Sequence, residues 1–233
     1  MDPAPQPSID VAVVGGTGDL GYGVASRLAA AGKSVVIGSR AAERAQESAA
    51  TLAAAVPGST VTGAANEDAV ASAALVVLAV PFSAHASTLK GIAKIARPGQ
   101  VFLDATVPLA PSVGGRPTRL VGVWQGSAAE QVRELLPDTV HVVSGLHTIS
   151  AASLTDLEHV FDEDVLLCGD DAGAKQAVSA LITTIPGLRP VDCGKLDSAR
   201  LIESLTPLLI GLNIRNKTHT GIRIVGLPTK EHA

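Results

Sequence analysis

The chain has 233 residues and a formal net charge of −4, and 46% of its residues are hydrophobic while 2% are aromatic. This length predicts one domain with a smaller addition, and a core of aliphatic side chains suits an α/β fold. The negative charge argues against a nucleic-acid surface, because counterion release needs clustered lysine and arginine. No apolar run reaches the ~20 residues that span a bilayer, and residues 1–8 predict a flexible tail without signal-peptide features. We therefore expect a cytoplasmic protein with neither a membrane nor a nucleic-acid partner.

The first regular segment is an apolar run of β-branched residues, 10–14, that leads into a glycine-rich turn. Gly16, Gly18 and Gly21 give this turn the pattern G-x-G-x-x-G. The first glycine would permit a tight turn, the second the approach of a pyrophosphate, and the third close packing of the next helix. A helix over residues 20–31 would then direct its N-terminus at the anion. The pattern predicts a dinucleotide site, and a glycine-rich turn that serves packing alone is the alternative.

The end of the second strand, expected over residues 34–37, indicates which dinucleotide binds. An NAD site usually has a carboxylate here, whereas the 2′-phosphate of NADP needs hydrogen-bond donors and positive charge. The chain has Ser39 and Arg40 at this point, Arg44 one helical turn later, and the hydroxyl of Thr17 in the glycine turn. These residues predict NADPH as the cofactor. For Arg44, a role as an ordinary solvated side chain stays open.

Helices and strands alternate through the next part of the chain. The expected elements are helix 41–55, strand 60–62, helix 67–72, strand 75–80, helix 84–96 and strand 101–103. A loop rich in proline and glycine, 108–117, is followed by helix 127–136 and strand 141–143. This alternation predicts an α/β fold with a Rossmann-type parallel sheet and helices on both faces, in an NADP-binding domain over residues 9–145.

The remaining residues, 146–233, predict a small C-terminal α/β lobe. Its expected elements are strand 165–167, helix 172–184, strand 188–191 and a long apolar helix over 197–215. Pro207 lies inside that helix, where it removes one backbone donor and should cause a kink. We expect this lobe to complete the substrate pocket. The apolar helix fits either a homodimer contact or the core of a single chain.

Ligands of open α/β sheets bind beyond the carboxyl ends of the strands, and the sequence places few acid–base groups there. Tyr22 is the only tyrosine and belongs to the glycine turn, so the Tyr-x-x-x-Lys pair of short-chain dehydrogenases is absent. We assign His85 a structural role, while for His147 a catalytic role and a plain hydrogen-bonded role are both open. The sequence has no motif for a nucleophilic serine, a zinc helix or an ATP phosphate loop, and we expect no metal.

Several motifs resemble, in order and spacing, those of the F420-dependent NADP oxidoreductases. They are Gly15-Gly16-Thr17-Gly18-Asp19-Leu20-Gly21, Gly38-Ser39-Arg40, Ser144-Gly145-Leu146-His147-Thr148-Ile149, Cys168-Gly169-Asp170-Asp171, Gly187-Leu188-Arg189-Pro190 and Glu203-Ser204-Leu205-Thr206-Pro207-Leu208. The resemblance implies a small two-lobed reductase that transfers a hydride reversibly between NADPH and coenzyme F420, a 5-deazaflavin. It also implies direct transfer between stacked rings, for which positioning supplies much of the rate and no nucleophile is required.

The same resemblance implies which residues contact the two ligands. For NADP they are Gly16, Thr17, Gly18, Asp19, Leu20, Gly21, Ser39, Arg40, Arg44, Val80, Pro81 and Phe82. For the deazaflavin they are His147, Ile149, Leu205, Thr206 and Pro207. His147 would orient the deazaflavin or form a hydrogen bond with it, without acting as an obligatory base. Two alternatives stay open: an NADPH-dependent reductase of imines or small carbonyl compounds, and a non-catalytic NADPH-sensing protein.

Overall fold

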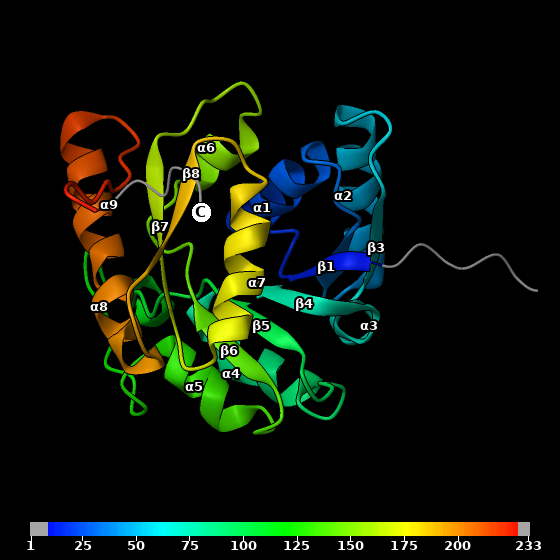
Figure 1. The fold of residues 1–233 in the computed structure, drawn as a ribbon, viewed down its shortest axis with the longest axis horizontal. Coiled ribbons are helices and arrows are strands. Elements are labelled where there is room, and N and C mark those ends of the chain that lie inside the picture. The colour runs from blue at the N-terminus through cyan, green and yellow to red at the C-terminus, as the bar shows by residue number, and fades with distance from the viewer. Residues whose placement is uncertain (1–8, 228–233) are drawn as a thin grey trace, which may run out of the picture.

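A computed structural model describes residues 9–227, in which eight strands form one sheet with helices on both faces (Figure 1). The spatial order of the strands is β3-β2-β1-β4-β5-β6-β7-β8. Their bounds are β1 Ile9–Val14, β2 Val35–Ser39, β3 Val61–Ala65, β4 Ala73–Leu78, β5 Val101–Asp104, β6 His141–Ser144, β7 Glu163–Gly169 and β8 Leu188–Asp192. The predicted α/β fold of Rossmann type is confirmed. The tail predicted over residues 1–8 lies outside the described residues.

The helices follow the order expected from the sequence, with one addition. They are α1 Asp19–Ala30, α2 Ala42–Ala55, α3 Asn66–Ser72, α4 Phe82–Ile92, α5 Ala128–Leu135, α6 Ala151–Thr155, α7 Ala172–Thr183, α8 Ala199–Glu203 and α9 Leu205–Asn216, with short 3-10 helices at Ala110–Val113 and Leu196–Ser198. The added helix, α6, has five residues and is therefore too short to show a helical period in the sequence. Within residues 9–227, no helix is both long and apolar enough to cross a membrane.

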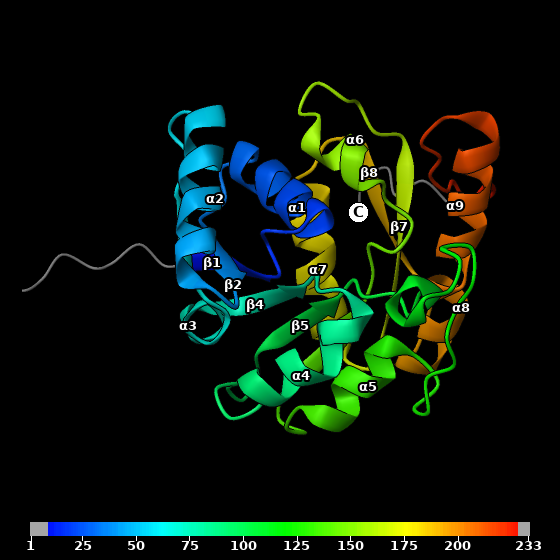
Figure 2. The ribbon, with the colours of Figure 1, turned by 180° about the vertical axis from the view of Figure 1, so that it is seen from behind.

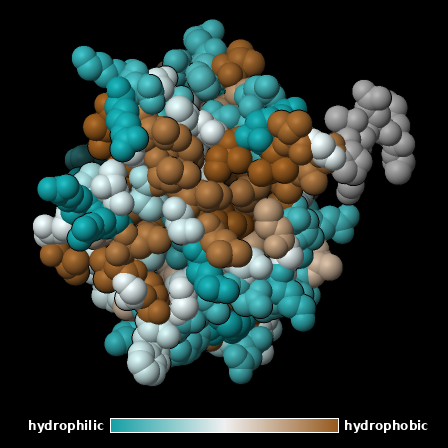
Figure 3. Space-filling model, turned by 90° about the vertical axis from the view of Figure 1, so that its left-hand side faces the viewer, coloured by the Kyte–Doolittle hydropathy of each residue, from teal (hydrophilic) through white to brown (hydrophobic). Residues whose placement is uncertain are grey.

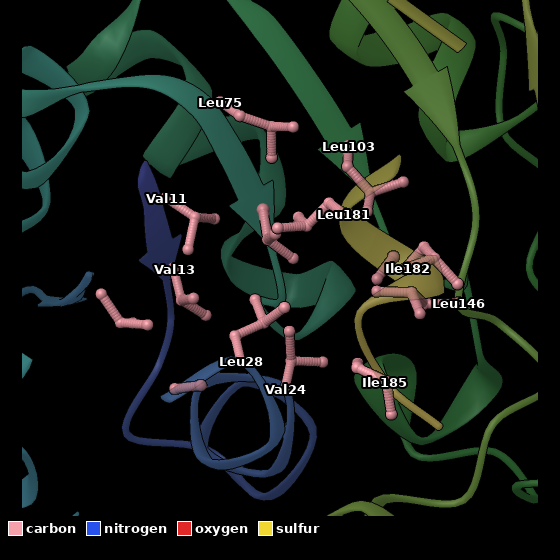
Figure 4. Packing of buried hydrophobic residues seen from close by; sticks show 14 of the residues in the cluster. Val11, Val13, Val24, Leu28, Leu75, Leu103, Leu146, Leu181, Ile182 and Ile185 are labelled. Atoms are coloured by element: carbon pink, nitrogen blue, oxygen red, sulfur yellow. The ribbon is translucent and has the colours of Figure 1, made fainter. Parts of the chain in front are cut away.

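Alternate residues of each central strand are buried on opposite faces of the sheet. In β5, Leu103 packs in the core under α1, α2 and α7, whereas Phe102 packs in the core under α3, α4 and α5. Figures 1 and 2 show α1 and α2 on one side of β4 and β5, and α4 and α5 on the other. The first core is continuous from Leu28 of α1 to Ile182 of α7 (Figure 4). One hydrophobic core therefore joins the early and late parts of the chain.

Strands β7 and β8, which the sequence analysis assigned to a small C-terminal lobe, join the same sheet as the first six strands, and β7 runs antiparallel to its neighbour β6. In this pairing Ser144 lies opposite Cys168 and Val143 opposite Gly169, and β8 pairs parallel with β7. The carboxyl ends of β6 and β7 therefore meet, and residues 163–167 extend beyond the carboxyl edge of the sheet beside β8. This geometry arises because the chain leaves β6 and turns back at that edge without crossing the sheet. The predicted division into 9–145 and 146–233 falls inside this sheet and stays a prediction.

The long helix expected over residues 197–215 is interrupted. A 3-10 turn and α8 precede Ser204, and α9 begins directly after it. Pro207 lacks the N–H group that would bond to the carbonyl of Glu203, and its ring crowds that carbonyl. The prediction of one kinked helix is therefore wrong. Two helices, α8 and α9, are separated at Ser204, about one turn before Pro207.

A buried arginine attaches α1 to the segment after β6. The guanidinium of Arg27 donates hydrogen bonds to five backbone carbonyls, of Ser153, Leu154, Asp156, Leu157 and His159. It also lies over the ring of Phe161, 4.7 Å from the ring centre. Because carbonyl oxygens replace the water that the cation loses, the charge can be buried without a carboxylate partner. These contacts hold α6 against the helix that follows the glycine turn.

Candidate active site

The glycine turn connects β1 to α1 at the carboxyl edge of the sheet. The left-handed conformation lies at Gly15, with φ of 78°, and not at Gly16, where the sequence analysis placed the tight turn. Gly16 is needed because a Cβ there would lie 2.8 Å from the carbonyl oxygen of Val13. A Cβ on Gly21 would lie 2.5 Å from the carbonyl oxygen of Gly15, so α1 packs close to the turn as expected. The turn leaves no room for side chains at these positions.

The N-terminus of α1 opens toward solvent at this turn. Its N-cap residue is Gly18, which is exposed and carries no side chain to accept the first N–H groups of the helix. A pyrophosphate can therefore accept hydrogen bonds from those N–H groups and is favoured by the helix dipole. The added Cβ of a side chain at Gly18 would have only the carbonyl oxygen of Gly15 nearby, at 3.5 Å, so the space above it is open.

The end of β2 lies directly beside this turn. The backbone N–H groups of Gly15 and Gly16 both donate to the carbonyl of Gly38, at 3.1 Å. Ser39 is buried and Arg40, which follows it, is exposed. Arg40 and Arg44 take part in no ion pair within residues 9–227. Their guanidinium groups are therefore available to a 2′-phosphate bound beside the turn.

A cavity of about 470 Å³ opens next to the glycine turn, where the carboxyl ends of β4, β5 and β6 face α9. This volume is within the range of about 300–1,000 Å³ that is common for ligand pockets. Its walls are Gly18, Asp19, Leu20, Ala79, Val80, Pro81, Phe82, Ala105, Thr106, Val107, Leu109, Leu146, His147, Thr148, Ile149, Ser150, Ala151, Thr206, Leu209, Ile210, Asn213 and Thr220. Of these lining residues, two are titratable, Asp19 and His147.

Most of the expected contact residues lie at or near this cavity. Those that line it are Gly18, Asp19, Leu20, Val80, Pro81, Phe82, His147, Ile149 and Thr206. Six others do not line the cavity: Gly16 and Thr17 lie in the adjoining turn, Gly21 in the first turn of α1, Ser39 and Arg40 at the end of β2, and Arg44 in the first turn of α2. The geometry thus divides the expected residues between a cavity and a neighbouring polar surface.

Two of the expected residues do not line the cavity. Leu205 packs against a small buried cluster that includes Leu166 and Ile202. Pro207 lines a separate groove with Leu208. Successive residues of a helix point about 100° apart, so Thr206 faces the cavity while its two neighbours do not.

His147 is buried in the wall of the cavity and held through its backbone. Its carbonyl accepts a hydrogen bond from the hydroxyl of Thr206 at 2.8 Å. Both ring nitrogens are buried, and neither has a hydrogen-bond partner within residues 9–227. Burial lowers the pKa of His147 to about 4, so the ring is neutral at physiological pH. A buried, neutral ring of this kind is a weak base.

A second histidine, which the sequence analysis treated as structural, lies buried behind the cavity. Nε2 of His85 donates to Oδ1 of Asp104 at 3.3 Å, and Nδ1 donates to Oε1 of Gln131 at 3.0 Å. Burial opposes the charged ring, but the carboxylate and the two hydrogen bonds outweigh it and raise the pKa of His85. Because both nitrogens lie beside oxygens that can accept a hydrogen bond, the surroundings favour the protonated ring. His85 therefore supports the cavity from behind and does not line it.

Glu203 completes this group of buried polar residues. Its two carboxyl oxygens accept hydrogen bonds from the backbone N–H groups of Ala128 and Ala129, at 3.1 and 3.2 Å, at the start of α5. The side chain is almost fully buried, and burial raises its pKa to about 8. We call His85, Asp104, Gln131 and Glu203 the buried polar cluster.

No sequence motif identifies this cluster. Asp104 and Gln131 are separated from His85 by 19 and 46 residues, and no motif links them. One signal was present, because Asp104 follows directly after an apolar strand, at the edge where ligands collect. Among residues 9–227, no three His, Cys, Asp or Glu residues are grouped so that they could hold a metal ion.

Comparisons with known proteins bear on the same site. Residues 10–108 match the family model described as NADP oxidoreductase, coenzyme F420-dependent. The chain is 44% identical to the F420-dependent NADP reductase of Methanothermobacter marburgensis, over 94% of this chain and 99% of that protein. It is 40% identical to the protein of the same name from Methanocaldococcus jannaschii, over 93% and 98% of the two chains.

A solved structure with this arrangement comes from Arthrobacter sp. FB24, and an F420-dependent NADP-reductase function has been suggested for that protein. The TM-score is 0.75 at 30% sequence identity, over 90% of this chain and 96% of the other. With its glycine turn, its basic β2 end and this similarity over nearly its whole length, the chain belongs to the family of F420-dependent NADP oxidoreductases.

Proposed function

We propose that the protein transfers a hydride reversibly between NADPH and coenzyme F420. NADPH supplies or receives the hydride at its nicotinamide ring, and the deazaflavin ring is the other partner. Family membership and the names of the two methanogen relatives support this reaction. The glycine turn and Arg40 fit the nucleotide, and residues 146–151 and α9 complete the cavity for the second ring.

The observation that carries the proposal is the scarcity of acid–base groups in the cavity. Reduction of an imine or a carbonyl requires a proton donor beside the hydride. Of the residues that line the cavity, His147 has a pKa of about 4 and Asp19 lies in the first turn of α1. With this pKa, His147 is not suited to donate a proton at neutral pH. Reduction of the deazaflavin takes up a hydride at a ring carbon and a proton at a ring nitrogen, but the negative charge formed at that nitrogen is delocalised over the ring system, so water can supply the proton. The cavity therefore has only to orient the two rings, without a proton donor of its own.

Spectrophotometry with purified protein tests the proposed function. We expect NADPH to bleach the visible absorbance of oxidised F420 at an enzymatic rate, because the rings of the two cofactors meet in the cavity. Mixtures of NADPH with cyclic imines and with small ketones serve as comparison. NADPH oxidation by those compounds without bleaching of F420 would support the reductase alternative, and binding without any turnover would support the sensing alternative.

Replacing His147 with alanine should weaken F420 binding or slow transfer by about tenfold, while the affinity for NADPH stays within about twofold. The expected loss is that of a hydrogen bond to a ligand in a buried site. NADPH affinity should persist because the glycine turn and Arg40 lie apart from His147. Titration of NADPH fluorescence and steady-state kinetics measure the two effects. Unchanged kinetics would remove His147 from the site.

We also propose that the protein forms a homodimer through α9 and the nearby loop. Leu208 and Ile214 of α9 are 59% and 63% exposed, and Trp124 of the loop is 97% exposed. Figure 3 shows apolar side chains gathered on the face to which α8 and α9 belong. An apolar patch of this kind is uncommon on monomers, and a second copy of the chain would cover it symmetrically.

The oligomeric state tests this contact. Sedimentation should give a dimer for the natural protein and a monomer for Leu208→Glu combined with Ile214→Glu, since two buried charges disfavour the interface. A monomer at micromolar concentration for the natural protein would contradict the proposal. A cytoplasmic location and the absence of a nucleic-acid partner stay predictions from the sequence.

A further inference from the structure

Asp104 connects three elements behind the cavity. Its Oδ1 accepts a hydrogen bond from His85 on α4 and one from the backbone N–H of Thr106, at 3.2 Å. Thr106 and Val80 both line the cavity, and the hydroxyl of Thr106 donates a hydrogen bond to the carbonyl of Val80 at 3.4 Å. The carboxylate therefore fixes the turn after β5, and through it the residues after β4. Asp104 itself is fully buried and does not line the cavity.

The same aspartate lies beside the turn that carries His147. Asp104 pairs with Ser144 in the parallel register of β5 and β6, and its carbonyl accepts the N–H of Gly145 at 3.0 Å. The next residues, Leu146 to Thr148, form the cavity wall. Leu146 is held at a positive φ of 71°, a conformation that non-glycine residues adopt only when their surroundings impose it. The turn with His147 thus depends on tight support at the end of β5.

Helix α5 connects His85, the hydrogen-bond partner of Asp104, with Glu203 of α8. Gln131, in the middle of α5, bonds to His85, and the start of α5 is bonded to Glu203 of α8. Three residues after Glu203, the hydroxyl of Thr206 holds the carbonyl of His147. A series of hydrogen bonds and short helical segments therefore runs from Asp104 through α4, α5 and α8 to the backbone of His147.

The charges in this region favour a fixed arrangement. Burial opposes the charged form of His85, whereas the titratable groups Asp104 of β5 and Glu203 of α8 favour it, and together with the hydrogen bonds they raise the pKa of His85. Oδ2 of Asp104 is buried and has no hydrogen-bond partner within residues 9–227. Removing these charges from water costs free energy, and one carboxylate oxygen stays without a hydrogen bond, so the pair need not stabilise the fold. The alternative use of such a pair is to specify one geometry.

We propose that Asp104 is a positioning residue for hydride transfer, because through Thr106, His85 and α5 it sets the spacing between the cavity turns after β5 and β6. This inference rests on the proposed function for its kinetic consequence. A misplacement of the reacting rings by the order of 1 Å can lower the rate about a hundredfold, so a small shift of either turn should lower kcat measurably. The glycine turn and the end of β2 are not part of this arrangement, whereas Val80 is, so NADPH binding should change much less than the rate of hydride transfer.

The test compares three variants of the full-length protein. Asp104→Ala removes the acceptor and the charge, whereas Asp104→Asn keeps an oxygen that can accept from Thr106. Gln100→Met is the matched control: Gln100 is equally buried at the opposite end of β5, where its amide donates to the carbonyls of Val70 and Ala73. We expect Asp104→Ala to lower kcat with F420 about tenfold or more, Asp104→Asn to lower it less, and Gln100→Met to leave it within about twofold. The Kd for NADPH should stay within about twofold in Gln100→Met, and in the two Asp104 variants it should change by a smaller factor than kcat, because Val80 alone of the expected NADP contacts is bonded to this arrangement.

A second measurement uses the ligand-free protein and needs no turnover. In NMR spectra, Asp104→Ala should shift the amides of Thr106 and of residues 146–148, and His85 should titrate at a lower pH than in the natural protein. Changes in Gln100→Met should be confined to the other edge of the sheet. An unchanged kcat in Asp104→Ala, an equal loss in Gln100→Met, or unshifted amides at 146–148 would each overturn the inference. Natural protein that fails to bleach F420 contradicts the proposed function instead, and the NMR result still decides the positioning role.

Discussion

Replacing Arg40 with aspartate should lower the affinity for NADPH by about a hundredfold and leave the affinity for NADH within about threefold. The loss of charge-assisted hydrogen bonds to a phosphate is worth about 1.5–3 kcal/mol, and each 1.4 kcal/mol is tenfold in Kd. The introduced carboxylate would also repel the 2′-phosphate, whereas it can accept hydrogen bonds from the ribose hydroxyls of NADH. Arg40 is exposed and free of ion pairs within the described residues, so the substitution should not disturb the fold.

Titration of dinucleotide fluorescence without F420 measures both affinities directly. Arg116→Asp is a suitable control, because Arg116 is exposed on the loop between β5 and α5. This substitution changes the net charge by the same amount as Arg40→Asp. Arg44→Ala in parallel shows whether the second guanidinium contributes. An equal loss of NADPH and NADH affinity in Arg40→Asp would contradict the assignment of Arg40 to the 2′-phosphate.

Glu203 should make the protein less stable as the pH rises from about 6.5 to 8. Burial raises the pKa of this carboxyl from 4.5 to about 8 in the folded chain. Between these values the unfolded chain has lost the proton and the folded chain retains it, so a rise in pH favours unfolding. The contribution of Glu203 is complete below pH 4.5 and is lost as the pH approaches 8. Over the upper 1.5 units this amounts to about 2 kcal/mol of unfolding free energy.

Urea unfolding at pH 6.5 and pH 8 tests this prediction in the natural protein and in Glu203→Gln. The glutamine of this variant cannot titrate. The loss of unfolding free energy from pH 6.5 to pH 8 should therefore be about 2 kcal/mol smaller in the variant than in the natural protein. The raised pKa of His85 also removes stability as the pH rises, so the informative quantity is the difference between the two proteins. Glu134→Gln, on the exposed side of α5, should behave like the natural protein. Equal pH dependence in Glu203→Gln would show that Glu203 is ionised in the fold.

The sequence predicted the first half of the fold well because its signals are local. A buried strand, a glycine turn, a helix and a second strand succeed one another within about thirty residues, and each has its own period or breaker. The later part was predicted less well for a similar reason. The direction of β7 depends on where the chain re-enters the sheet, and a run such as Val165 to Leu167 is equally apolar in either direction. The break at Ser204 has no signal besides the proline three residues later.

The candidate site divides in the same way. The glycine turn and Arg40 form a motif of fixed spacing, and the spacing alone indicates a dinucleotide. The cavity walls come from the segments after four strands, β1, β4, β5 and β6, and from α9, so the sequence nominated the segments but not which side chains face inward. Leu205 and Thr206 are adjacent in the chain, yet one packs in the core and the other lines the cavity. That outcome depends on the rotation of α9 against the sheet.

Local chemistry therefore determined the fold class, the nucleotide and its 2′-phosphate preference, since each depends on residues that are neighbours in the chain. Tertiary structure decided the arrangement behind the cavity. His85, Asp104, Gln131 and Glu203 lie on four different elements, and their pairing needs α4, α5 and α8 to pack on one face of the sheet. Their burial, and the burial of His147, sets which of them carry protons. Burial and long-range pairing are properties of the packed molecule, and no spacing in the sequence encodes them.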